Sequence, residues 1–256
     1  MRKSARRIFC RFCGAAGVHR HGLDARRRAR FKCPHCGRTF TGRTNTAKSG
    51  SRFSDAEWET AAGLFCMRGG VCGRDLARFF GVNEKTGQRL NRVFRTMAGT
   101  FQPGRLPGFS EWDEAVPIRF QWVVGGVSRT SGQCSLHCVE SRNEDTLTPL
   151  VERHTDPEGT VFTDEWGGYC GLLNRMTVCH QQGFVSSAAP HVHTNAIEGV
   201  WGHLKPLGRH VYRGFPRLTL PAYLAEFMFR YNIRCYRTRL SVLSALLSRK
   251  SHTLLV

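Results

Sequence analysis

The spacing of hydrophobic and polar positions divides the 256-residue chain into three regions. Residues 1–50 show no sustained periodicity and are rich in Arg, Gly and Cys. From residue 51 to residue 99 apolar side chains recur at helical spacing, whereas from residue 109 onward apolar runs of strand length alternate with helical stretches. The segment 100–108 holds two Pro and two Gly residues and is predicted to be a linker.

The middle region, 51–99, predicts a helix-turn-helix. A first helix is expected over 55–67, and a second over 74–80 ends at Gly81. Asn83 can cap a third helix over 84–97. A basic outer face on the helix after the turn is what docking in the DNA major groove requires, although a plain three-helix packing module with solvated arginines fits the pattern too. The outer-face residues are Lys85, Gln88, Arg89 and Arg92.

The third region, 109–256, predicts an α/β (α+β) domain. Three strands linked by turns are followed by a helix, a buried strand ending at Asp164, a short strand and a helix that carries Glu198. This order is that of an RNase H-like sheet, in which the first strand lies beside the fourth. Asp113 would then meet Asp164 although about fifty residues separate them. The elements are expected at 109–118, 120–128, 133–140, 144–153, 160–164, 175–180 and 195–207.

The charge of the chain indicates a polyanionic partner. With 38 Lys and Arg against 19 Asp and Glu, the net charge is +19. Basic side chains that neutralise phosphates release condensed counterions, although a basic ribosomal-type protein would fit the same arithmetic. Apolar runs fall short of the ~18 residues of a membrane span, and the first residues lack the apolar run of a secretory signal. We therefore expect an intracellular protein of the bacterial cytoplasm or the eukaryotic nucleus.

Two Cys-x-x-Cys pairs in the first region predict one structural Zn²⁺ and a zinc ribbon over 1–50. The chain has eleven cysteines at scattered spacing, and in an intracellular protein this favours free thiols and metal ligands over disulfides. A glycine follows each pair and permits the tight turn that a zinc knuckle needs. The four expected ligands are Cys10, Cys13, Cys33 and Cys36.

An arginine run between the two pairs suggests that this ribbon also contacts nucleic acid. The guanidinium group matches phosphate geometry, and several such groups in sequence form a basic patch. The alternative is a ribbon whose arginines form a solvated face and touch no DNA. The residues concerned are Arg26, Arg27, Arg28 and Arg30.

Convergence of Asp113, Asp164 and Glu198 would create a divalent metal site. Carboxylates within a few ångströms raise one another's pKa, and divalent metal removes that cost. Two Mg²⁺ (or Mn²⁺) ions can activate an attacking oxygen and stabilise a leaving oxygen, which suggests phosphodiester cleavage and transfer. Glu114 and Glu165 adjoin the two aspartates, but neighbours on a strand point to opposite faces, so only one of each pair is expected to serve.

Three stretches resemble the DDE-class transposases of insertion sequences, in the ISXO-type group related to Merlin transposons. They are TDEWGGY at 163–169, HVHTNAIEGVWGHLK at 191–205 and the helix at 223–234, with WDEAV at 112–116 as a weaker fourth. The resemblance covers roughly residues 109–236, and the group often carries an N-terminal zinc ribbon. It implies that Asp113, Asp164 and Glu198 form the metal-binding triad and that Lys205 contacts DNA near the scissile phosphate.

The resemblance implies a transposase that binds the terminal inverted repeats of its element, cleaves phosphodiester bonds and joins 3′-hydroxyl ends to target DNA. Double-stranded DNA would be bridged by a homodimer or a higher oligomer. His193 is a further candidate for phosphate contact, and Asn195 is either the cap of its helix or a group at the catalytic site. Two other classes stay open: a transposase-derived DNA-binding regulator without catalysis, and a general RNase H-like nuclease or resolvase.

Several finer expectations concern single residues. Pro206 directly follows Lys205 and is expected to stop that helix. Trp166 and Trp201 are expected in the core. A second zinc site is disfavoured because its spacing matches no common knuckle. Its candidate ligands are Cys170, Cys179, His180, His191 and His193.

Overall fold

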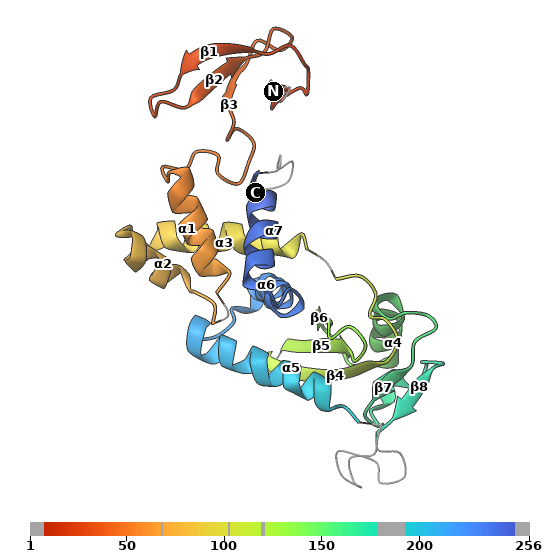
Figure 1. Ribbon diagram of the computed structural model, residues 1–256. Helices are drawn as coiled ribbons and strands as arrows, with labels where there is room; N and C mark the ends of the chain where they lie inside the picture. Colours follow the sequence, from red (N-terminus) through yellow and green to blue (C-terminus); the bar gives the residue numbers. More distant parts are fainter. Residues whose placement is uncertain (1–7, 68, 102, 119–120, 179–192, 249–256) are drawn as a thin grey trace. The chain divides into compact units, whose positions relative to one another are not determined.

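The computed structural model describes residues 8–67, 69–101, 103–118, 121–178 and 193–248. The chain divides into two compact units, Met1–Thr60 with Ser241–Val256, and Ala61–Leu240 (Figure 1). Helices α1 (Asp55–Phe65) and α7 (Tyr236–Ser248) each run across the boundary between them. The domain boundaries expected from the sequence, at residues 50, 99 and 108, are not tested by this division and stay predictions. No helix in the described part of the chain is long and apolar enough to cross a membrane.

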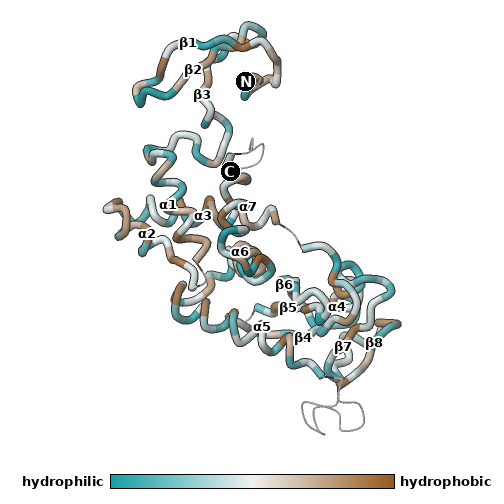
Figure 2. Tube along the Cα trace, viewed as in Figure 1, coloured by the Kyte–Doolittle hydropathy of each residue, from teal (hydrophilic) through white to brown (hydrophobic). Residues whose placement is uncertain are grey.

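The first unit contains a small antiparallel sheet of order β1-β2-β3, made of His19–Leu23, Ala29–Lys32 and Thr39–Thr41. Its core is minimal, because only Phe40 and two cysteines are buried together. The hairpin between β1 and β2 carries hydrophilic residues (Figure 2). A core of this size contributes little hydrophobic stabilisation to the segment.

The second unit contains the predicted pair of helices, α2 (Gly73–Phe80) and α3 (Glu84–Gly99). Gly81 ends α2 in the left-handed conformation at φ 62°, and the Asn83 side chain caps α3 by accepting from the Thr86 amide at 2.9 Å. A Cβ on Gly87 would overlap the carbonyl oxygen of Gly73, so the two helices cross in close contact. The predicted outer face of α3 is exposed at all four positions, Lys85, Gln88, Arg89 and Arg92.

A five-stranded mixed sheet of order β6-β5-β4-β7-β8 follows. Neighbouring pairs among β4, β5 and β6 are antiparallel, whereas β4 pairs with β7 and β7 with β8 in parallel. The mixed α/β class and the expected pairing of the first strand with the fourth are thereby confirmed. The strands are β4 Ser110–Ile118, β5 Gln121–Ser128, β6 Cys134–Val139, β7 Val161–Thr163 and β8 Arg175–Thr177.

Helices cover both faces of this sheet. On one face, α4 (Glu144–His154) and the 3₁₀ turn η1 (Gly167–Tyr169) pack with Trp112 of β4. On the other face, α5 (Asn195–Pro206) and α6 (Leu220–Asn232) pack against β5 and β6. Gly125 and Gly126 of β5 make room for the Trp201 ring and the Trp112 ring respectively, since a Cβ at either position would overlap that ring.

Three finer expectations need correction. The α-helix α5 does end at Pro206, but the chain continues directly as a π-helix, η3 (Leu207–Tyr212). Proline fits helical φ, and the Gly202 carbonyl, which Pro206 cannot donate to, belongs to an exposed residue and can bond to water instead. Trp201 is buried as expected, whereas Trp166 is 42% exposed, because its indole lies over a surface arginine and not in the core. Thr194, not Asn195, occupies the N-cap of α5.

His137 of β6 makes the stability of the second unit sensitive to acid. Its ring lies against that of His154, with centroids 4.0 Å apart and the planes tilted by 33°. Burial, followed by the charges of His154 and Arg153, lowers the pKa of His137 to about 4. Histidine in an unfolded chain has a pKa of about 6.5. Between this pKa and that of the folded protein, the unfolded state binds a proton at His137 and the folded state does not. The free energy of unfolding should therefore fall by about 3 kcal/mol as the pH is lowered through this window.

Urea unfolding at about pH 7 and about pH 4 measures this loss. The variant His137→Gln removes the titrating group while retaining a polar partner for Ser135, whose Oγ lies 2.7 Å from His137 Nε2. Its stability should depend less steeply on pH than that of the parent. Equal slopes for parent and variant would show that other groups control the acid sensitivity.

Candidate functional site

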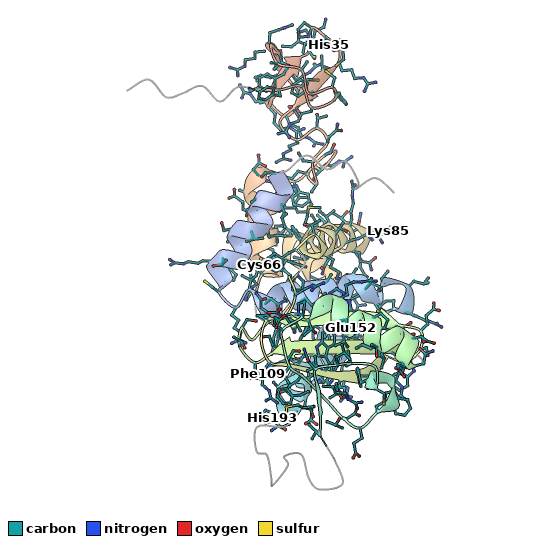
Figure 3. The ribbon with its side chains drawn as sticks, turned by 90° about the vertical axis from the view of Figure 1, so that its right-hand side faces the viewer. His35, Cys66, Lys85, Phe109, Glu152 and His193 are labelled. Carbon is teal, nitrogen blue, oxygen red and sulfur yellow. The ribbon has the colours of Figure 1, made fainter. Side chains whose placement is uncertain are left out.

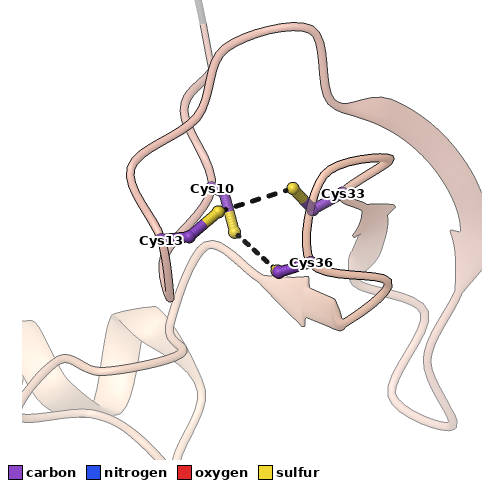
Figure 4. A group of neighbouring side chains, drawn as sticks. All are labelled: Cys10, Cys13, Cys33 and Cys36. Atoms are coloured by element: carbon purple, nitrogen blue, oxygen red, sulfur yellow. Dashed lines mark hydrogen bonds between the residues drawn. The ribbon is translucent and has the colours of Figure 1, made fainter.

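The four predicted zinc ligands converge in the first unit (Figure 4). Gly14 and Gly37 follow the two pairs at φ 78° and 70°, which confirms the tight turns predicted for the knuckles. In each knuckle the glycine amide donates to the carbonyl of the first cysteine, at 3.1 Å for Gly14 and 3.0 Å for Gly37. The two turns therefore present their thiols toward one point.

The sulfur spacing suits zinc. Cys10 and Cys36 Sγ lie 3.7 Å apart, as do Cys13 and Cys33 Sγ. A tetrahedron with Zn–S bonds of about 2.3 Å has edges of about 3.8 Å, so an ion at its centre would meet all four sulfurs at bonding distance. The cluster thus fits a structural Zn²⁺, with every coordination position taken by a thiolate.

A second cluster, of carboxylates, lies where β7 ends beside β4. Ligand oxygens of Asp113, Glu114 and Asp164 lie within 4.8 Å of one another. Glu111 on β4 pairs with Phe162 on β7 in parallel, so two residues further along Asp113 and Asp164 come level. The predicted meeting of these two aspartates is present in the structure.

Glu114 joins this cluster against expectation. Side chains do alternate along β4: Asp113 accepts from Trp201 Nε1 at 2.8 Å on the α5 face, whereas Glu114 lies toward Tyr169 on the α4 face. Glu114 nevertheless lies near both aspartates, because β7 ends at Thr163 and its pairing with β4 stops at Glu111. Beyond that point both side chains can reach round the strand toward Asp164. Which of these carboxylates bind metal stays a prediction.

The electrostatics of the cluster favour a bound cation. Burial, and then the charges of Asp164 and Asp113, raise the pKa of Glu114 to about 7, against a smaller opposing effect of Arg142. Burial also raises the pKa of Asp113, with Asp164 and Glu198 adding to it against the Trp201 hydrogen bond. Glu114 Oε1 is buried without a hydrogen-bond partner. A divalent cation would stabilise all of these charges and satisfy that oxygen.

Glu198 and Lys205 lie on α5, which borders the cluster. Glu198 is exposed in the first turn and is not among the three grouped carboxylates, although its charge contributes to the raised pKa of Asp113. Lys205 is exposed near the other end of the same helix. The structure therefore brings Asp113 and Asp164 together and leaves Glu198 beside them.

Glu111 is a site residue that the sequence reasoning missed. Its fully buried carboxylate accepts from the amides of Ala196 and Ile197, at 2.7 and 3.0 Å, and so occupies the N-terminus of α5. Arg129 Nε donates to it at 2.6 Å, and His193 Nδ1 lies 3.2 Å away. This ties the helix bearing Glu198 to β4 two residues before Asp113. The one feature of the sequence that could have indicated a role for Glu111 is its position two residues before Asp113. That feature does not distinguish it from an ordinary surface glutamate.

Some of the residues predicted to contact DNA are bonded to other parts of the protein, whereas others are exposed. His193, which precedes α5 and is labelled in Figure 3, has its ring and carbonyl engaged by Glu111 and Arg129, whereas Asn195 is exposed. In the first unit Arg28 pairs with Asp24 at 2.7 Å, and Arg26 donates to the Ser51 carbonyl at 2.6 Å. Arg27 is exposed, and Arg30 lies 3.3 Å from Thr39 Oγ1. Of the remaining candidate ligands, Cys179, His180 and His191 lie outside the described residues.

Residues 120–232 match the family model of the ISXO2-like transposase domain. This segment therefore supports a DDE insertion-sequence transposase of the ISXO type, in agreement with the resemblance seen in the motifs. The matched segment includes Asp164, Glu198 and Lys205 and begins shortly after Asp113 and Glu114. A domain of this family suggests a metal-dependent enzyme that acts on DNA. No curated protein matches the chain.

Proposed function

We propose that this protein binds the terminal inverted repeats of a mobile element, cleaves the phosphodiester bond at each end and joins the freed 3′-hydroxyl to target DNA. The observation that carries the proposal is the approach of Asp113, which lies just before the ISXO2-like segment, to Asp164, which lies inside it. The two aspartates are about fifty residues apart in the chain but stand on paired strands and form one carboxylate cluster. The strand order, with three antiparallel strands followed by two parallel ones, supports an RNase H-like assignment of this domain.

In this proposal Asp113 and Asp164 hold two Mg²⁺ or Mn²⁺ ions, with Glu198 and Glu114 completing the ligand set. When bound, the ions would activate the attacking oxygen and stabilise the leaving oxygen. The Trp201 indole fixes the rotamer of Asp113 through its hydrogen bond. Glu111 fixes the start of α5, so that Glu198 and, further along the helix, Lys205 are presented to the DNA backbone.

Asp164→Asn tests the proposed activity. We expect nicking of a duplex that carries the element end, in Mg²⁺ or Mn²⁺, to fall by about 10³-fold, or ~4 kcal/mol, because the amide is a poor ligand for the cation. DNA binding should persist. The matched control is Glu165→Gln, which removes the exposed neighbouring carboxylate and should nick like the parent. Parent-level nicking by Asp164→Asn would remove Asp164 from the site, and a parent that binds ends without nicking them would favour a regulator.

Glu114→Gln and Glu198→Gln test the rest of the ligand set. Each is expected to lower nicking by about 10²-fold, or ~3 kcal/mol, because each removes one carboxylate from the cations. Titration with Mg²⁺ should show partial recovery at high concentration if the lost group is a ligand. A variant that keeps the nicking rate of the parent at low Mg²⁺ would exclude its glutamate from the set.

A further inference from the structure

A groove of about 550 Å³ runs between the helix-turn-helix and the η3 segment of the second unit. Arg74 and Arg78 line it from α2, Gln88 and Arg92 from α3, and His210 and Arg213 from η3 and the residue after it. We call this the arginine groove. Gln88 and Arg92 also belong to the exposed face of α3, so the groove continues directly from the surface predicted to meet the DNA bases.

Most of the positive charge in the arginine groove has no counter-charge. Arg74 lies 3.6 Å from Glu84, which is a loose exposed pair. Among the described residues, no carboxylate pairs with Arg78, Arg92 or Arg213, and all three are exposed. Asp75 is the other acid that lines the groove, and it accepts from Cys72. Several like charges facing one groove repel each other, and this repulsion is relieved when a polyanion enters.

The floor of the groove is packed and contains a buried counter-charge. Arg95 lies over the Tyr223 ring at 3.8 Å from its centroid and pairs at 2.7 Å with the fully buried Glu226, which it shares with Arg230. The close crossing at Gly73 and Gly87 fixes one wall. The unneutralised arginines therefore stand at the rim of a preformed channel, where guanidinium groups can form paired hydrogen bonds with phosphate oxygens.

We propose that the arginine groove binds the phosphodiester backbone of the DNA duplex whose bases α3 contacts. This deepens the proposed function and rests on it. Arg78 and Arg213 each neutralise a phosphate from opposite sides of the groove. They therefore set the register of the duplex on the protein and carry no sequence information themselves.

The salt dependence of binding by the full chain tests this assignment. Fluorescence anisotropy with a labelled duplex, measured at several NaCl concentrations, gives the slope of log K against log salt. Each phosphate contact contributes about 0.9 to that slope, so Arg78→Ala with Arg213→Ala should reduce it by about 1.8. The affinity should fall by the same factor for end-bearing and for unrelated duplexes. The matched control, Arg105→Ala with Arg237→Ala, removes the same charge from two exposed arginines outside the groove and should leave the slope unchanged.

The outcomes separate this inference from the function on which it rests. Arg78→Lys with Arg213→Lys keeps the charge and should retain the slope of the parent. A slope equal to that of the parent in the alanine variant overturns the groove assignment even if the parent binds and nicks DNA. An equal reduction in the control variant also overturns it. A parent that binds no duplex DNA contradicts the proposed function itself.

Discussion

Cys33→Ser should unfold residues 8–41, and a zinc chelator should have the same effect on the parent protein. Cys33 is fully buried in a core that otherwise contains only Cys10 and Phe40, so we expect metal binding to supply most of the folding free energy of this segment. Structural zinc contributes on the order of 10 kcal/mol, which exceeds what so small a core can provide. Hydrogen exchange of the full chain, with zinc content measured by mass spectrometry, would show fast exchange over residues 8–41 and loss of the ion.

The control for this experiment is Cys235→Ser, which replaces an exposed thiol outside the cluster. It should keep one zinc per chain and slow exchange in β1–β3. If Cys33→Ser kept both, the four thiols would not be the elements that hold this segment together, and the zinc ribbon interpretation would fail.

The second large effect is expected at Glu226, which joins α3 to α6. Its fully buried carboxylate accepts from Arg95 of α3 at 2.7 Å, from Arg230 of its own helix at 2.5 Å, and from the Tyr212 hydroxyl. In Glu226→Gln, the largely buried guanidinium groups of Arg95 and Arg230 lose their counter-charge. Removing one partner of such a buried pair costs about 3–5 kcal/mol, so the denaturation midpoint in urea should fall markedly.

Two further variants test the cause of that loss. Glu152→Gln removes an exposed carboxylate from α4 and should change the free energy of unfolding by less than about 0.5 kcal/mol. Glu226→Met combined with Arg95→Met and Arg230→Met replaces the charged group by apolar side chains and should recover much of the stability. If the triple variant were no more stable than Glu226→Gln, packing and not charge would explain the defect.

Local patterns predicted the parts of this protein whose structure depends on near neighbours. The Cys-x-x-Cys-Gly spacing dictates a knuckle, because two thiols and a left-handed glycine within five residues leave few other conformations. Helical spacing, Gly81 and Asn83 likewise predicted α2, its end and the cap of α3. The alternation of strand and helix patterns predicted the pairing of β4 with β7, and hence the meeting of Asp113 with Asp164.

Tertiary structure decided which side chains complete the site. Whether Glu114 reaches Asp164 depends on the residue at which β7 stops pairing with β4. The sequences of the two strands do not predict that residue. Glu111 resembles a surface acid until the start of α5 and Arg129 converge on it, and Trp166 resembles a core residue until its indole is found over Arg142. The sequence by itself thus determined the elements, the cluster of four cysteines and the meeting of the two aspartates, because short-range geometry and strand order specify them. The arginine groove and the remaining site residues depend on distances between segments far apart in the chain, and those distances exist only after the helices and the sheet have packed.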